Sequence, residues 1–303
     1  MEDSRKCSVI SARRYRLTER HVLMLQALAN HKALTRKHLT DLFFGSVRRC
    51  QVHVAYLKRL GLIRETTGLP RPERGSAPPV YALTAAGARV VDRDGRSLLM
   101  RTYRNLVGSD LHLRHTVAVN DFFTKLLTAA RSQGDHLEWL GEDACRAYYA
   151  DVHAHIPQLT PDGAGTLCLG PIETRFFLEL DRGTERQGWL RQKYRRYLLH
   201  LAGRVGAEAL HVLFVVPDGR RERLIHKVGQ AALRGAVSPH PGFWTATQNG
   251  LRVEGPLGAV WARVSGGSGK RARLSEIGRP GPPLPSLSPP VFDSATDVSL
   301  KAA

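Results

Sequence analysis

Apolar residues in the first hundred positions recur at helical spacing and then give way to short extended segments. Thr18, Thr35 and Ser46 each precede such a helical stretch, so they are expected to cap three successive helices. Gly61 follows the third stretch, where a left-handed residue commonly ends a helix. The segments LIRETT and VYALT then predict a two-stranded hairpin joined by the turn-rich GLPRPERGSAPP. Three helices and a hairpin predict a winged helix-turn-helix over residues 1–107.

The third of these helices divides into an apolar and a polar side. Val47, Cys50, Val54, Leu57 and Leu60 fall at helical spacing and are expected to face inward. The polar set left for the other faces is Arg48, Arg49, Gln51, His53, Lys58 and Arg59. The hairpin tip adds Arg71 and Arg74.

From residue 108 the pattern changes to that of a mixed α/β domain, expected to extend to residue 264. After a connector at about 98–115, a helix is expected over HTVAVNDFFTKLLTAARSQG, and one or two strands over HLEWLGEDACRAYYA. LCLG and RFFLELD predict strands around a turn at Gly170–Pro171. LHVLFVVP lies between two basic helical stretches, TERQGWLRQKYRRYLLHLAG and GRRERLIHKVGQAAL, which is typical of a strand in a parallel sheet.

The last segment, residues 265–303, is rich in proline, glycine and serine. It holds too few large apolar residues to offset the entropy of ordering, so it is expected to be a disordered tail. The fold class that the sequence predicts is therefore α+β, with a helical N-terminal domain, a mixed α/β domain and a tail.

The charge balance favours nucleic acid as the partner. The chain has 45 Lys and Arg against 27 Asp and Glu, a formal net charge of +18. Such an excess suits double-stranded DNA, because every phosphate contact releases condensed counterions. No apolar run has the ~18 residues of a membrane span, and the N-terminus lacks a secretory signal. We therefore expect a cytoplasmic protein without a membrane partner, whose four dispersed cysteines are reduced.

The expected DNA contacts follow from how winged helices dock. The third helix enters the major groove, which would bring Arg48, Arg49, Gln51 and His53 to the bases. Lys58 and Arg59 extend this basic surface. Arg71 and Arg74 at the hairpin tip would contact phosphate or the minor groove.

Three acids in the α/β domain form a candidate metal site. Glu179 and Asp181 share one side of the strand RFFLELD, where two acids among apolar residues are costly unless paired, hydrogen-bonded or bound to a cation. Asp162 begins the preceding strand, and antiparallel pairing would bring it beside Glu179. Three hard oxygen ligands suit Mg²⁺ or Mn²⁺. The alternative is that these acids pair with arginines of a neighbouring helix and carry no chemistry.

Two further groups are candidates for chemistry. Lys193 lies fourteen residues beyond Glu179, on a helix that can fold back over the sheet, where it would polarise a scissile phosphate or hold the attacking water. His112 and His115 are spaced to share one helical face, as in a metal or relaxase site, or they cap and pack. The role of His115 stays open.

The segments RLTERHVLMLQAL, YALTAAGA, LRHTVAVNDFF and PDG…FFLELDRGTE…K, spread over residues 16–217, resemble the replication-relaxation family of plasmid and mobile-element proteins. The second half also resembles the PD-(D/E)XK nuclease fold, a restriction-endonuclease-like mixed sheet flanked by helices. The resemblance implies that Asp162 is the first acid of that motif and Glu179 the second. Asp181 stands where the motif has lysine, so Lys193 is the candidate replacement.

Two functions from different classes follow. The first is a DNA-binding protein of plasmid or mobile-element replication or relaxation whose α/β domain uses Mg²⁺ or Mn²⁺ to cut or nick a phosphodiester. The second is a non-catalytic winged-helix transcriptional regulator or replication initiator, in which the α/β domain forms a homodimer or recruits partners. Asp181 in place of lysine favours the second.

Overall fold

The structure is a computed structural model that describes residues 16–66, 69, 76–91, 110–150, 159–202, 206–265 and 269–280 of the chain. It is an α+β protein of two compact units, Met1–Thr124 and Lys125–Ala303. The division falls within helix α7 (Asp110–Ser132), and the sequence had placed the boundary earlier, after residue 107. No helix in the described ranges is long and apolar enough to cross a membrane.

The first unit has the predicted order of three helices and a hairpin. Its elements are α2 (Glu19–His31), β1 (Leu34–Thr35), α3 (Arg36–Phe43), α4 (Val47–Arg59), β2 (Ile63–Thr66), β3 (Val80–Leu83) and α5 (Ala85–Val91). The short β1 pairs with β3 on the side opposite β2, giving an antiparallel sheet in the order β1-β3-β2. The turn after α4 uses Gly61 at φ 66°, as expected of a left-handed residue. The hairpin tip, with Arg71 and Arg74, lies outside the described residues.

Helices α2 and α3 begin with the same device, a threonine followed three residues later by a histidine. Thr18 and Thr35 accept hydrogen bonds from the backbone N–H of His21 and His38, and each histidine Nδ1 accepts from the backbone N–H of its threonine. The proton of each neutral imidazole is therefore on Nε2. His21 Nε2 donates to His53 Nδ1 on α4 at 2.8 Å, so one cap also joins two helices.

Helix α7 begins at Asp110, inside the segment expected to be a connector, and its polar residues bind the preceding helices. Asn120 donates to the carbonyl oxygens of His31 and Ala33, at 2.9 and 2.7 Å. The neighbouring Asp121 accepts from His38 Nε2 at 2.6 Å. These contacts give the segment LRHTVAVNDFF a structural role at the junction of α2, α3 and α7.

The second unit is built on a single mixed sheet. Its elements are β4 (His136–Gly141), α8 (Glu142–Ala150), β5 (Gly163–Leu169), β6 (Ile172–Leu180), α9 (Gln187–Leu201), η1 (Ala207–Ala209), β7 (Leu210–Val216), α10 (Gly219–Leu233), β8 (Gly242–Thr247), α11 (Gln248–Glu254), β9 (Trp261–Arg263), β10 (Arg271–Ala272), α12 (Leu274–Ile277) and β11 (Arg279–Pro280). Only the backbone of 147–150 and 279–280 is described.

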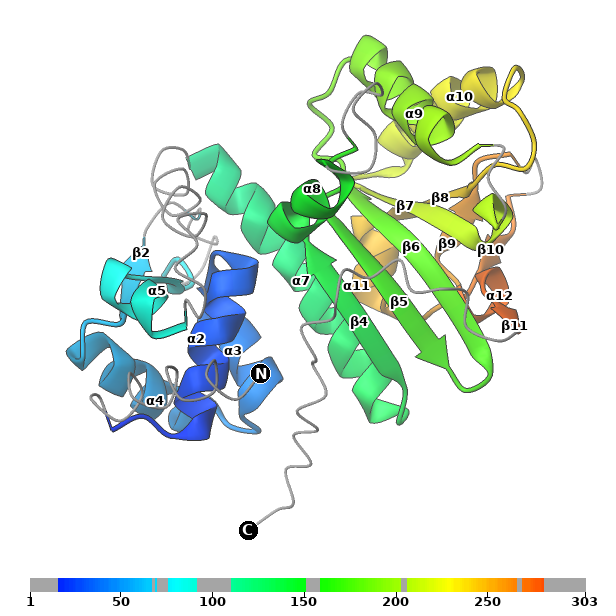
Figure 1. Cartoon of the computed structure of the whole chain (residues 1–303). Helices are drawn as coiled ribbons and strands as arrows, with labels where there is room; N and C mark the ends of the chain where they lie inside the picture. The colour runs from blue at the N-terminus through cyan, green and yellow to red at the C-terminus, as the bar shows by residue number, and fades with distance from the viewer. Residues whose placement is uncertain are drawn as a thin grey trace. The chain divides into compact units, whose positions relative to one another are not determined.

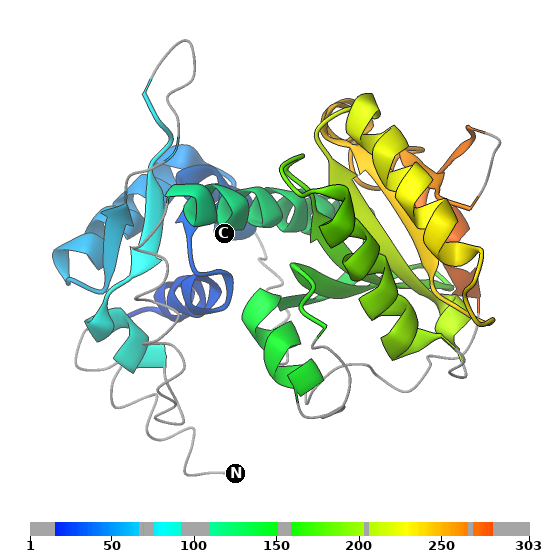
Figure 2. The same ribbon diagram turned by 90° about the horizontal axis from the view of Figure 1, so that it is seen from above.

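The strands follow the order β10-β9-β8-β7-β6-β5-β4, with β11 added to β6. Strands β4, β5 and β6 are antiparallel, whereas β6, β7 and β8 are parallel and are connected by α9 and α10. These two helices lie side by side against the sheet (Figures 1 and 2). The strand predicted for LHVLFVVP is β7, which is buried along its whole length.

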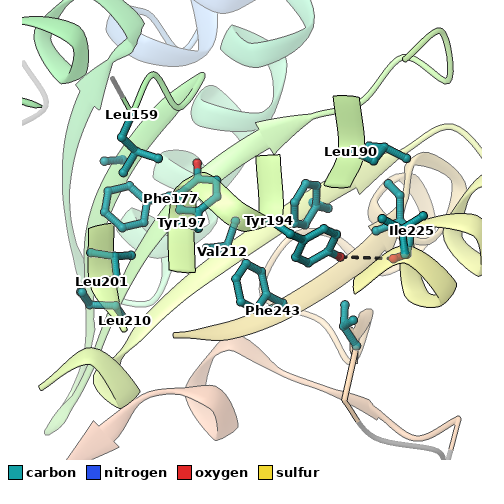
Figure 3. Packing of buried hydrophobic residues seen from close by; sticks show 14 of the residues in the cluster. Leu159, Phe177, Leu190, Tyr194, Tyr197, Leu201, Leu210, Val212, Ile225 and Phe243 are labelled. Atoms are coloured by element: carbon teal, nitrogen blue, oxygen red, sulfur yellow. Dashed lines mark hydrogen bonds between the residues drawn. The ribbon is translucent and has the colours of Figure 1, made fainter. Parts of the chain in front are cut away.

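The core of this unit fills the space between the sheet and helices α9 and α10 (Figure 3). Tyr194 and Tyr197 of α9 are fully buried there and contact Phe243, and Tyr194 donates a hydrogen bond to the carbonyl oxygen of Ile225. The alternating residues Phe177, Val212 and Phe214 complete the packing from the strands. The tyrosines of α9 therefore belong to the core.

Two predictions in this unit are wrong. The stretch EDACRAYYA forms helix α8 and not a strand, with Glu142 and Asp143 in the first turn, where acids favour the helix dipole. The disordered tail does not begin at residue 265, because β10, α12 and β11 lie between residues 271 and 280. Leu274 and Ile277 of α12 are buried, which stabilises this segment against β6. Residues 281–303 lie outside the described part of the chain.

Candidate functional site

Helix α4 presents a wide polar face at the surface of the first unit. Arg48, Arg49 and Gln51 are exposed, as expected, and the helix contains no Asp or Glu. Val52 lies among them with 65% of its surface exposed, and Ala55 is exposed one turn further on. The buried side of the helix carries Cys50, Val54 and Leu57. The face consists of cations and amides around a small apolar centre.

The other residues expected on this face have different surroundings. His53 is half-buried: its Nδ1 accepts from His21 and its ring packs 4.9 Å from that of Phe44, so one side of the ring expected to reach DNA is engaged by neighbouring residues. Burial lowers its pKa, and Arg20 lowers it further. Lys58 forms an exposed ion pair with Glu65 at 2.7 Å, and Arg59 lies over the ring of Tyr56. Val47, expected inside, is the first residue of the helix and is 53% exposed.

The second candidate site lies at the end of strand β6 in the other unit. Asp162, just before β5, donates its backbone N–H to the carbonyl oxygen of Leu178, and its Oδ2 accepts from the backbone N–H of Leu180 at 2.7 Å. The expected adjacency of Asp162 and Glu179 is thus confirmed by the register of β5 and β6. Both carboxylates also act electrostatically on Lys193.

Two side chains of helix α9 contact the Glu179 carboxylate, one at each oxygen. Tyr197 donates to its Oε1 at 2.5 Å, and the Lys193 ammonium lies 2.8 Å from its Oε2. Lys193 and Tyr197 are four residues apart, so they project from the same face of the helix. Only 3% of Glu179 is exposed, and burial raises its pKa to about 7 against the pull of Lys193.

Lys193 also contacts a second acid, Glu185, whose Oε1 lies 3.0 Å from the ammonium. Burial alone would lower the pKa of Lys193, but Glu179, Glu185 and Asp162 together raise it above its ordinary value. The other oxygen of Glu185, Oε2, is buried without a hydrogen-bond partner. The lysine therefore stays charged between two carboxylates, one of which has an unsatisfied oxygen.

Asp181 does not join this group. Arg221 of α10 donates to both of its oxygens, from Nε at 2.5 Å and from Nη2 at 3.1 Å, and the Gly183 N–H donates to Oδ1. The Asp181 side chain has no exposed surface and the Arg221 side chain only 9%. The expectation that Asp162, Glu179 and Asp181 meet around one cation is wrong for Asp181, because an arginine satisfies its charge.

No group of three His, Cys, Asp or Glu side chains within the described ranges is arranged to hold a metal ion. His112 and His115, in the first two turns of α7, are therefore not part of such a group. The carboxylates that contact Lys193 are those of Glu179 and Glu185, which are hard oxygen ligands of the kind that Mg²⁺ and Mn²⁺ prefer. Lys193 lies among them as their counter-ion.

Several residues of these sites carried no usable signal in the sequence. The hydroxyl of Tyr197 binds Glu179, and the only sequence feature that links it to the site is its spacing of four from Lys193. Glu185 lies in the loop before α9, and Arg221 is forty residues from Asp181. Only the folded chain brings such pairs together.

The comparisons with known proteins agree with the resemblance that the sequence suggested. A family model described as replication-relaxation matches residues 25–208, more than half of the chain. The chain belongs to the replication-relaxation family. Membership in this family indicates a role in the replication or relaxation of plasmids or mobile elements. A search of curated proteins and a search of solved structures each found no match.

Proposed function

We propose that this member of the replication-relaxation family binds double-stranded DNA through its first unit, acting as a winged helix with α4 in the major groove. The observation that carries the proposal is the exposed face of α4, which has Arg48, Arg49 and Gln51 and no acid. Arginine and glutamine are side chains that read base edges and neutralise phosphates. The exposed Val52 at its centre offers an apolar contact of the kind a thymine methyl accepts.

The test is the salt dependence of DNA binding by the full chain, measured by fluorescence anisotropy with a labelled duplex. The wild type should show a steep slope of log K against log salt, on the order of −5 for six phosphate contacts. Arg48→Ala with Arg49→Ala should weaken binding and reduce the slope by about 2, since each lost phosphate contact removes about 0.9.

The matched control removes two exposed cations from other helices of the same unit, Lys37→Ala on α3 with Arg89→Ala on α5. This control should leave the slope nearly unchanged. Equal losses in the two double variants would show that the charge acts without a defined face, and the role of α4 would be lost.

Metal-dependent phosphodiester cleavage by the second unit is the second candidate function. The antiparallel β4-β5-β6, the helix α9 and the parallel β7 support the nuclease-like fold that the resemblance implied. The specific observation is that Asp162 and Glu179 lie with Lys193 at the end of β6. Glu179 and Glu185, together with oxygens of the bound phosphate, would hold Mg²⁺ or Mn²⁺, and the bound cation would stabilise the charge that develops on the phosphate.

In this candidate function, residues of the chain bind the phosphate and orient the carboxylates. Lys193 supplies a positive charge to a phosphate oxygen, because its pKa lies above the ordinary lysine value and it stays protonated. Tyr197 fixes one oxygen of Glu179, which leaves the other directed toward Lys193. Asp162 is oriented by the backbone N–H of Leu180.

Conversion of supercoiled plasmid to nicked or linear DNA, with Mg²⁺ or Mn²⁺, tests the cleavage. Glu179→Gln should abolish it, whereas Glu142→Gln, which alters a surface ion pair with Arg146, should leave it intact. If the folded wild type cuts nothing while it binds DNA, the non-catalytic regulator or initiator remains, with the second unit serving dimerisation or partner recruitment.

A further inference from the structure

Lys193 occupies the place among the carboxylates that a metal ion would need. Its ammonium nitrogen lies 2.8 Å from Glu179 Oε2 and 3.0 Å from Glu185 Oε1, and Asp162 adds a third negative charge nearby. An ammonium and a divalent cation compete for the same oxygens and repel each other at contact distance. While Lys193 stays there, the carboxylates are already neutralised.

We propose that Lys193 is a displaceable counter-ion, which lies between Glu179 and Glu185 in the free protein and leaves them for a DNA phosphate, so that a divalent cation binds there only together with DNA. This inference rests on the cleavage function proposed for the second unit. It concerns the order in which the site is loaded, which that proposal leaves open.

Of Lys193 and Glu179, the lysine is the side chain that can move. The Lys193 side chain is 22% exposed, whereas the Glu179 side chain is 4% exposed and is also held by Tyr197. Lysine has a flexible four-carbon stem with an ammonium that bonds in any direction, so it can turn toward a phosphate at the surface. Glu179 cannot follow, because its Oε1 stays bound to the Tyr197 hydroxyl.

One of the two carboxylates also has an oxygen that the lysine does not satisfy. Glu185 Oε2 is buried and without a hydrogen-bond partner, although the other oxygen of the same carboxylate binds Lys193. A buried carboxylate oxygen without a partner is costly, and a cation coordinated by it would remove that cost. Two carboxylates together with a DNA phosphate are a ligand set that Mg²⁺ and Mn²⁺ accept once the ammonium has moved.

A DNA phosphate supplies the negative charge that Lys193 needs when it leaves the two carboxylates. A lysine that leaves two carboxylates needs a new anion, and the phosphate backbone presents one at short intervals. The carboxylates that it leaves then need a new cation, which is the divalent ion. Without DNA neither half of the exchange is favourable.

The experiment measures Mn²⁺ binding to the full chain by the loss of the free-ion electron paramagnetic resonance signal, at a fixed, mildly alkaline pH. The wild type should bind Mn²⁺ about tenfold or more tightly with a duplex than without it, a ratio equivalent to ~1.4 kcal/mol. Lys193→Met should bind Mn²⁺ without DNA, and Lys193→Gln provides a second variant if Met impairs folding. Lys227→Met, which removes an exposed lysine of α10, should behave as the wild type. Glu179→Gln with the duplex corrects for Mn²⁺ held by DNA itself.

Three results would overturn the inference. Equally tight Mn²⁺ binding by the wild type with and without DNA would mean that Lys193 does not block the site. No binding by either Lys193 variant would mean that the carboxylates are not a cation site. Binding by the variants but not by the DNA-bound wild type would make Lys193 a permanent substitute for the metal. Anisotropy on the same samples shows separately whether DNA is bound, so failure of the DNA-binding proposal is distinguishable from each.

Discussion

Replacing Arg221 by methionine would test whether Asp181 is a structural residue at the end of β6 or belongs to a functional site. Arg221 makes two hydrogen bonds to the Asp181 carboxylate and a third, from Nη2 at 2.8 Å, to the carbonyl oxygen of Glu185. It is the third residue of α10, one turn after the capping Asp218. Methionine keeps most of the side-chain length but removes the charge and all of these donors.

The size of the effect follows from the burial of the pair. The Asp181 side chain has no exposed surface, so without Arg221 its charge would stay buried with one remaining partner, the Gly183 N–H at 2.7 Å. Removing one member of a buried ion pair typically costs about 3–5 kcal/mol. Removing both members together should cost much less, because no uncompensated charge is left.

Urea denaturation at neutral pH, followed by circular dichroism, measures both quantities. Arg221→Met should lower the free energy of unfolding by about 3–5 kcal/mol, and Asp181→Asn in the same chain should recover a large part of that loss. The difference between the double variant and the sum of the single variants gives the coupling energy of the pair. A loss below ~1 kcal/mol for Arg221→Met, or a coupling energy near zero, would refute the assignment of Asp181 to a structural pair.

Three further perturbations have defined expectations. Tyr197→Phe removes the hydrogen bond to the Glu179 carboxylate and should cost about 1.5–3 kcal/mol in a urea titration above pH 7; an unchanged midpoint would exclude that bond. The pKa of Glu179 is raised to about 7, so its contribution to stability is fully present below the unfolded value and is lost as pH rises through 7; Glu179→Gln should flatten that part of the thermal stability profile. Gly87→Ala places a methyl group against the Leu62 carbonyl oxygen and should destabilise the first unit by at least ~1–3 kcal/mol, whereas Gly45→Ala, with open space around it, should change little.

The parts of the fold that the sequence predicted well are those set by local chemistry. Thr18 and Thr35 cap the helices expected of them because a threonine oxygen satisfies the first free backbone N–H groups wherever the chain turns into a helix. Gly61 takes the left-handed conformation for an equally local reason. The apolar run of β7 is buried on both faces, which is the condition that its composition indicated.

Part of the candidate site could be predicted, because some of its residues are brought together by strand register and others only by the packing of distant elements. Asp162 and Glu179 are brought together by strand register, and alternation along a hairpin can be followed in a sequence. The partner of Asp181 could not be found in this way, since Arg221 reaches it only because β6 and β7 are parallel and α10 follows β7. The contact that engages His53 likewise depends on His21 of another helix.

The pairing of β11 with β6 has a practical consequence for anyone who shortens this chain. Arg279 and Pro280 pair with Glu173 and Ile172, at the part of β6 that precedes its pairing with β7. A truncation at residue 264, chosen on composition, would strip this cover and leave unpaired backbone groups along a strand edge. Such an edge is a template for adding a strand from another molecule. Self-association of a chain cut there would report the exposed edge rather than a natural dimer, so a shortened form should retain residues up to 280.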